Sequence, residues 1–284
     1  MKHAFAILAF VGASTMLHAQ RSTFSSKTEQ VRVDALVLEN GRPVGGLTRA
    51  DFDVFDQGVA QRVELQSLDE LPVDVTLALD MSDSLNGARL ERLRAAGRAV
   101  LAGLKPDDQA ALVTFSHVVH LGSKLTTHLD LVRNALGVSG DNGNTSLIDG
   151  TYSGIMIGGA GGGRSLLIVF SDGVDTASWL TPDAVLDVAR RSDITVYALS
   201  PRGDKRSSFL RDLTTFTAGR LYEVDPSSDV QQIFVSILDE FRRRYLLSFS
   251  PENVVPGGWH RLEVRVKGHP RATIVARSGY SADN

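Results

Sequence analysis

From residue 71 to residue 243 the sequence alternates short apolar runs with longer segments of helical periodicity. The apolar runs are rich in aliphatic and β-branched residues and are short enough for buried strands, at 73–79, 110–115, 166–170, 194–199 and 221–224. The segments with helical spacing lie at 90–104, 129–136, 146–156, 182–191, 208–216 and 229–243. Strands that alternate with helices predict a mostly parallel sheet covered on both faces. We therefore expect a doubly wound, Rossmann-like α/β domain at 71–243.

The segments on either side of this region have a different pattern. Short strands separated by turns are predicted at 31–38, 52–55 and 61–68, and again at 245–249, 259–266 and 272–277. Two or three strands alone are marginally stable in water. We therefore expect residues 20–70 and 244–284 to pair into one small all-β sandwich, with the α/β domain inserted between its halves.

The first 19 residues resemble a targeting segment more than a part of the fold. Lys2 is followed by an apolar stretch at 4–17 and then by His18 and Ala19. This order predicts a secretory signal peptide, residues 1–19, cleaved after Ala19, and a periplasmic or secreted protein. The stretch is short for a membrane span, so we expect no stable span after cleavage. An uncleaved anchor is the alternative, because only Lys2 and His3 supply positive charge before the apolar stretch.

Composition limits the partners. The chain has 284 residues, no cysteine and a net charge of −3, so disulfides do not hold it together. No basic excess favours nucleic acid, and we expect no nucleic-acid partner. The local basic cluster that ends at Arg244 is interpreted as the solvated end of a helix.

Oxygen-bearing side chains follow the predicted strands. Asp80, Ser82 and Ser84 come directly after the run 73–79, and Asp172 follows the run 166–170. Thr145 precedes a predicted helix. In open α/β sheets ligands bind at the carboxyl ends of the strands, where these loops can meet. Carboxylate and hydroxyl oxygens are ligands that Mg²⁺ prefers, so the pattern predicts a divalent-metal site.

The order Asp-x-Ser-x-Ser, then Thr, then Asp resembles the metal-ion-dependent adhesion site of von Willebrand factor type A (VWFA) domains. That resemblance implies that Mg²⁺, or Mn²⁺ or Ca²⁺, is surrounded by five residues: Asp80, Ser82, Ser84, Thr145 and Asp172. It also implies that an Asp or Glu of a protein partner completes the shell, as in cell adhesion. Asn144 departs from the family pattern, which often has a second glycine there. The mature chain also resembles a group of exported acidobacterial VWFA-related proteins, notably at 46–48, 51–58 and 245–280.

An aromatic residue near this site is a candidate for partner binding. Trp179 lies in a predicted loop after the Ser-Asp-Gly at 171–173. An aromatic side chain beside the metal could anchor a partner, or it could pack into the core of its own loop. The nearby Asp149 and Asp175 are interpreted as solvated turn or cap residues.

Two alternatives to a binding module use the same residues. A structural cell-envelope protein could use the metal only to stabilise loops. A magnesium-dependent phosphotransferase-type enzyme could use Asp80 as a nucleophile, but such enzymes commonly carry a second Asp two residues later, where this chain has Ser82. We therefore expect no enzymatic activity.

Other motifs predict less. The glycine-rich stretch at 158–163 precedes a strand, whereas a phosphate-binding loop follows one and opens a helix. It is therefore interpreted as a helix-to-strand connection. His117, His120 and His128 are interpreted as surface residues, because no nucleophile-elbow motif accompanies them.

Overall fold

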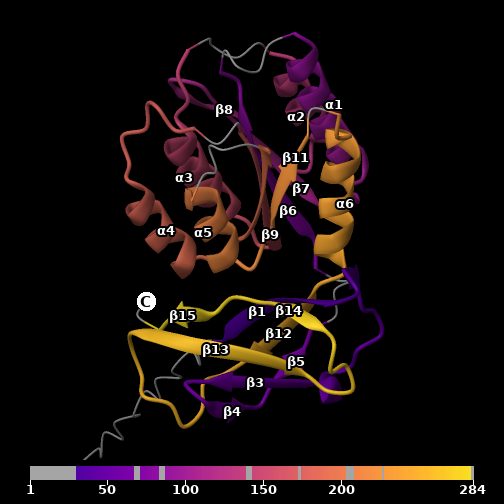
Figure 1. Ribbon diagram of the computed structural model, residues 1–284, viewed down its shortest axis with the longest axis vertical. Coiled ribbons are helices and arrows are strands. Elements are labelled where there is room, and N and C mark those ends of the chain that lie inside the picture. Colours follow the sequence, from indigo (N-terminus) through magenta and orange to yellow (C-terminus); the bar gives the residue numbers. More distant parts are fainter. Residues whose placement is uncertain are drawn as a thin grey trace, which may run out of the picture.

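The computed structural model describes residues 30–66, 71–82, 87–138, 143–171, 174–202, 208–225 and 227–282. An α/β domain lies above a β-sandwich in Figure 1, and the chain passes between the two domains twice. The predicted signal peptide, Ser84 and Asp172 lie outside these ranges. Within them, no helix has both the length and the apolar character that a membrane span requires.

The α/β domain is built on a six-stranded sheet with the order β11-β10-β9-β6-β7-β8. Neighbouring strands are parallel, except that β8 is antiparallel to β7. The strands are β6 (Val73–Asp80), β7 (Gln109–Phe115), β8 (Val119–Thr126), β9 (Arg164–Phe170), β10 (Thr195–Pro201) and β11 (Leu221–Val224). All residues of the central strand β6 are buried, as expected for a strand covered on both faces. The predicted α/β fold class is confirmed.

Helices cover both faces of this sheet (Figure 1). On one face lie α1 (Ala88–Ala102), α2 (Leu129–Leu136) and α6 (Val230–Arg242), and on the other lie α3 (Leu147–Gly158), α4 (Pro182–Arg191) and α5 (Ser208–Phe216). Successive residues of β6 point to opposite faces of the sheet and pack into two different hydrophobic cores. Leu77 and Leu79 pack toward α1 and α6, whereas Ala78 packs toward α3.

The β-sandwich combines segments from both ends of the described chain. One sheet has the order β14-β1-β12-β5, with β2 paired to β1, and the other has the order β15-β13-β3-β4. The strands of the first sheet are β1 (Val31–Glu39), β2 (Arg42–Pro43), β5 (Glu64–Leu65), β12 (Tyr245–Phe249) and β14 (Thr273–Val275). Those of the second are β3 (Phe52–Asp56), β4 (Val59–Gln61), β13 (Trp259–Val266) and β15 (Gly279–Ser281). Antiparallel pairing of β1 with β12 joins segments about 200 residues apart, for example Val33 with Leu247.

The predicted single strand at 61–68 is wrong. Strand β4 ends at Gln61 in one sheet, and Glu64–Leu65 pairs with β12 in the other. The chain therefore crosses from one sheet to the other within this segment. Val63, between the two strands, is buried in the core that the sheets share.

A buried polar cluster also ties the two chain segments of the sandwich together. Asp56, at the end of β3, is fully buried. Its Oδ1 lies 2.9 Å from Nδ1 of His260, and its Oδ2 accepts a hydrogen bond of 2.7 Å from the Tyr280 hydroxyl. A buried carboxylate requires such partners, since an unpaired one is costly to desolvate. Asp56 thus links β3 to β13 and β15.

Arg244 is not part of a solvated helix end, so that prediction is wrong. Helix α6 ends two residues before it and β12 begins directly after it, which places Arg244 between the two domains. Its side chain is fully buried, with Nε 3.3 Å from Oδ1 of Asp34 and Nη1 donating to the Tyr197 hydroxyl at 3.2 Å. Arg164 joins the same carboxylate at 2.6 Å. The domain junction is therefore held by buried ionic contacts.

Candidate metal centre

Asp80 is the last residue of β6 and lies at the carboxyl edge of the sheet. Its side chain is fully buried. Oδ1 accepts a 2.9 Å hydrogen bond from the backbone N–H of Ser82, and Oδ2 accepts a 2.8 Å hydrogen bond from the Ser171 hydroxyl. These bonds fix the orientation of the carboxylate. Ser82 itself is buried, so the polar end of this strand is enclosed by neighbouring loops.

A second loop brings Thr145 to the same edge. The backbone N–H of Met81 donates to the carbonyl of Phe115, and the N–H of Ser146 donates to the carbonyl of Ser116. The segment that contains Thr145 therefore lies beside the end of β7, which lies beside the end of β6. Thr145 is buried.

A third loop reaches the site through Ser171, which follows β9 and donates to Asp80. Sequence reasoning missed this role of Ser171, although the residue stands directly before Asp172 in the Ser-Asp-Gly motif. Of the five predicted ligands, Asp80, Ser82 and Thr145 are brought to one edge of the sheet. Ser84 and Asp172 lie outside the described residues, and the ligand assignment stays a prediction.

The loop after β9 is hydrogen-bonded to the segment that carries Thr145. The Thr176 hydroxyl accepts the N–H of Thr145 at 2.9 Å, and the N–H groups of Thr176 and Ala177 donate to the Thr145 carbonyl at 2.9 and 3.1 Å. Both backbone polar groups of Thr145 are thereby satisfied. The position of this residue thus depends directly on the loop.

The same loop caps helix α3. Oδ1 of Asp175 accepts the N–H of Ile148 at 3.2 Å, and the Ser178 hydroxyl accepts the N–H groups of Ile148 and Asp149. The first N–H groups of a helix have no partner inside the helix, so these contacts stabilise its start. Asp175 therefore acts as a cap, as predicted, although it caps a helix that precedes it in the chain.

Asp149 holds the backbone before α4. Its carboxylate accepts the N–H of Trp179 at Oδ2 and the N–H of Leu180 at Oδ1, both at 2.9 Å. The Trp179 side chain is 94% exposed. Packing of this side chain into the loop core is therefore excluded. Its predicted role in partner binding stays a prediction, but a fixed backbone presents the indole to solvent.

The donor set of this edge fits a hard divalent cation. It combines the Asp80 carboxylate with the hydroxyls of Ser82 and Thr145, and oxygen ligands of this kind suit Mg²⁺, Mn²⁺ and Ca²⁺. Ser116, between the two loops, has a buried hydroxyl without a hydrogen-bond partner among the described residues. A buried polar atom of this kind is commonly paired with a bound ion or water. In the ranges that the structure covers, no group of three or more His, Asp or Glu offers another metal site.

The two remaining motifs have structural explanations. His117, His120 and His128 are exposed, as predicted for surface histidines. The glycine stretch connects α3 to β9, and a Cβ on Gly161 would lie 2.0 Å from Oδ2 of Asp74. The backbone therefore wraps closely around the Asp74 carboxylate, which accepts the N–H of Gly163 at 2.7 Å. Burial raises the pKa of Asp74.

The sequence profile of the von Willebrand factor type A domain matches residues 74–235, more than half of the chain. The chain belongs to this family. The matched residues contain the whole α/β domain except its first residue and the end of α6. The expectation drawn from the Asp-x-Ser-x-Ser pattern is confirmed at the level of the family.

Relatives and solved structures share this domain. Inter-alpha-trypsin inhibitor heavy chain H6 of Homo sapiens is 24% identical over 249 residues, which are 77% of this chain and 19% of the relative. Heavy chain H1 of Sus scrofa is 24% identical over 239 residues, which are 77% of this chain and 26% of the relative. The chain thus spans only 19% and 26% of these two relatives.

Two structures resemble the fold at low sequence identity. A von Willebrand factor type A protein from Catenulispora acidiphila has a TM-score of 0.52 and 13% identity over 91% of this chain and 75% of its own. Proximal thread matrix protein 1 from the mussel byssus, with a zinc-occupied metal-ion-dependent adhesion site, has a TM-score of 0.53 and 14% identity over 65% of this chain and 49% of its own. At these identities the likeness shows the fold alone.

Proposed function

We propose that the type A domain binds a divalent cation and uses it to bind an Asp or Glu side chain of a protein partner. The ligands in this proposal are Asp80, Ser82, Ser84, Thr145 and Asp172. Type A domains commonly mediate protein interactions through such a site, and the mussel protein carries zinc there.

One observation carries the proposal: the buried Asp80 carboxylate is oriented by Ser82 and Ser171 at the point where the Thr145 loop also arrives. Two of the three described ligand candidates are neutral hydroxyls. A dication held by few carboxylates keeps positive charge and open coordination positions, and Mg²⁺ is often bound in this way. An acidic side chain from a partner is the natural ligand for such a cation, because it supplies the missing charge.

Trp179 is the second contact in the proposal. Its backbone N–H donates to Asp149, and its loop is hydrogen-bonded to Thr145, so the backbone that carries the indole has a defined position relative to Thr145. Large aromatic side chains dominate the binding energy of many interfaces. We therefore propose that partners place an apolar surface on Trp179 and a carboxylate on the metal.

The proposal includes location. The apolar segment after Lys2 supports export to the periplasm or the exterior, where an adhesion-type contact would occur. We assign no catalytic residue, because Ser82 occupies the position where a phosphotransferase of this type would carry its second Asp.

A displayed library of random peptides, selected on the immobilised mature protein in the presence of Mg²⁺, tests the function. Enriched peptides should contain Asp or Glu and should dissociate when EDTA is added. Binding should also be lost when that acid is changed to its amide, and in the Asp80→Ala protein. Trp179→Ala should weaken binding about tenfold or more, as expected for an aromatic hot spot, without lowering thermal stability.

Enrichment of peptides whose binding survives both EDTA and the amide exchange would contradict the metal-dependent function. If Mg²⁺ binds but no acidic peptide is enriched, the result supports the alternative of a structural cell-envelope protein, in which the cation only stabilises loops.

A further inference from the structure

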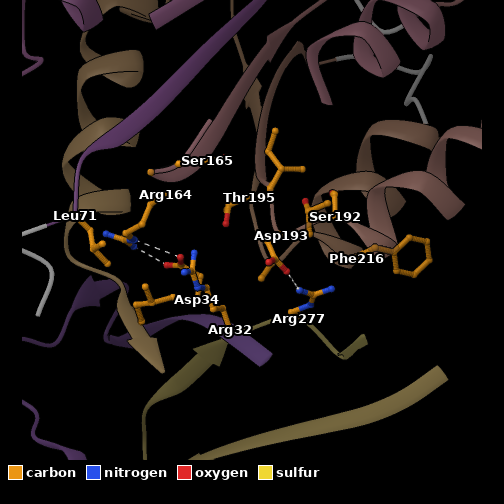
Figure 2. A pocket seen from close by; sticks show the side chains of 16 residues that line it. Arg32, Asp34, Leu71, Arg164, Ser165, Ser192, Asp193, Thr195, Phe216 and Arg277 are labelled. Atoms are coloured by element: carbon orange, nitrogen blue, oxygen red, sulfur yellow. Dashed lines mark hydrogen bonds and ion pairs between the residues drawn. The ribbon is translucent and has the colours of Figure 1, made fainter. Parts of the chain in front are cut away.

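A small cavity of about 60 Å³ lies between the two domains, at the amino edge of the central sheet. Figure 2 shows its lining side chains, which include residues of β1 of the sandwich, residues at the starts of β9 and β10 of the type A domain, and Asp193, Phe216 and Arg277. A single water requires roughly 10–15 Å³ of cavity volume, so this cavity takes a group of about four to six non-hydrogen atoms. That is the size of an inorganic oxyanion or a small carboxylate.

The walls of this cavity carry more positive than negative charge. Arg32, Arg164 and Arg277 line it together with Asp34 and Asp193. Arg164 bonds Asp34 through two nitrogens, at 2.6 and 3.4 Å, and Arg277 lies 2.5 Å from Asp193 (Figure 2). Both carboxylates are thus already neutralised by paired arginines.

Arg244 adds to this excess from behind the cavity wall, since its Nε also lies 3.3 Å from Asp34. On the negative side, the Asp74 carboxylate lies behind the wall as well, since it accepts the N–H of the lining Gly163, so four guanidinium groups stand against three carboxylates. The local surplus favours an anionic occupant.

Three hydrogen-bond donors of the cavity remain available. Arg32 is exposed, and its guanidinium makes no hydrogen bond or ion pair with any described residue. Thr195 is 2% exposed and makes none through its hydroxyl. Arg164 uses Nε and Nη2, and within the same ranges its Nη1 donates to nothing. By contrast, the hydroxyls of Ser165 and Ser192 donate to backbone carbonyls.

We propose that this cavity binds a small oxyanion, a phosphate, a sulfate or a free carboxylate, through Arg32, Arg164 and Thr195. Guanidinium groups bind such anions through charge-assisted hydrogen bonds, which are stronger than neutral ones. Arg32 belongs to the sandwich, whereas the other two residues belong to the type A domain. The occupant therefore joins the domains and stabilises their junction.

This site is separate from the metal centre and does not rest on its function. Arg164 and Thr195 are the first residues of β9 and β10, whereas Asp80 is the last residue of β6, and these strands are parallel. The two sites lie at opposite edges of one sheet.

Titration calorimetry and thermal unfolding of the mature protein test the proposal, with sodium phosphate, sulfate and acetate added at constant ionic strength. EDTA is present throughout, so that anions cannot bind through a metal at Asp80. We expect saturable binding of one anion per chain and a rise in the unfolding temperature. Arg32→Gln should weaken the affinity by about tenfold or more, because it removes charge-assisted bonds.

Arg42→Gln is the matched control, since Arg42 is an exposed arginine of the same domain outside the cavity, and it should leave the affinity unchanged. Thr195→Val keeps the shape of a buried residue and should also weaken binding, which guards against a folding defect in the arginine variant. Tighter binding of phosphate and sulfate than of acetate would identify a tetrahedral oxyanion as the occupant. Tighter binding of acetate would identify a carboxylate. Absence of saturable binding by all three anions, or equal affinity in Arg32→Gln and the wild type, would overturn the proposal.

Discussion

Strand β6 carries a buried aspartate near each end, and the two carboxylates have different surroundings. Asp74, near the sandwich, accepts the backbone N–H of Gly163 and the side-chain amide of Gln109. Asp80, at the opposite end, accepts a backbone N–H and the hydroxyl of Ser171. Both residues point to the same face of the sheet, because they are six positions apart and side chains alternate along a strand.

The difference extends to the two edges of the sheet. At the amino edge, the glycine stretch closes around Asp74, and the buried Arg164 of β9 and Arg244 of the domain junction pair with Asp34 of the sandwich. At the carboxyl edge, hydroxyl-bearing loops surround Asp80, and the exposed Trp179 lies in the loop between β9 and α4. The same strand thus supports a structural junction at one end and, in our proposal, a partner-binding metal at the other.

The largest expected effect comes from breaking the amino edge. Asp34→Ala leaves two buried guanidinium groups, Arg164 and Arg244, without their carboxylate. The free energy of unfolding should fall by about 3–5 kcal/mol, as is usual when one partner of a buried ion pair is removed. Urea unfolding followed by circular dichroism measures the change.

Asp53→Ala is the control, because Asp53 also lies on a sandwich strand but pairs with Lys267 at an exposed position. The free energy of unfolding should fall by only about 0–1 kcal/mol in this variant. Equal losses in the two variants would show that the buried pairs do not hold the junction.

A smaller effect is expected from the glycine stretch. In Gly161→Ala the new Cβ would lie 2.0 Å from Oδ2 of Asp74, so that carboxylate must move. We expect a loss of about 1–3 kcal/mol, typical of overpacking. Gly162→Ala meets no atom within 4 Å and should be neutral or slightly stabilising. Thermal unfolding of both variants checks this, and a loss at residue 162 as large as at residue 161 would contradict the account.

The smallest effect concerns pH. Burial holds the pKa of Asp74 above its usual range, whereas the unfolded chain releases this proton at lower pH. Between the two values the folded protein binds more protons, so the contribution of Asp74 to the free energy of unfolding falls as the pH rises. Asp74→Asn should remove this fall. A carbon NMR titration measures the pKa directly, and a value at or below the usual range would refute the prediction.

Local signals allowed most helices to be predicted. The bounds of α2, α4 and α5 agree with the predicted segments. The start of α4 follows from local sequence, because the Thr181 hydroxyl caps the helix by accepting the N–H of Ala184, and Pro182 occupies the first helical position. Features decided by distant pairing were missed. Strand β15 was not predicted, because its pairing with β13 defines it, and the burial of Arg244 depends on Asp34, 210 residues away.

The site shows the same division. Asp80, Ser82 and Thr145 could be proposed from a motif whose order is preserved along the chain. The hydrogen bond from Ser171 to Asp80 joins residues 91 positions apart, and the bond from the Trp179 N–H to Asp149 joins residues 30 positions apart. Neither contact follows from local sequence. The anion cavity could not be predicted at all, since its arginines come from separate domains.

Calorimetric titration of the protein with Mg²⁺ and Mn²⁺ tests the central claim most directly, with Asp80→Ala and Asp74→Asn measured in parallel. We predict saturable binding to the wild type and to Asp74→Asn, and none to a folded Asp80→Ala protein. Binding that persists in Asp80→Ala, or that fails in the wild type with both ions, would contradict a metal centre at the carboxyl edge of β6.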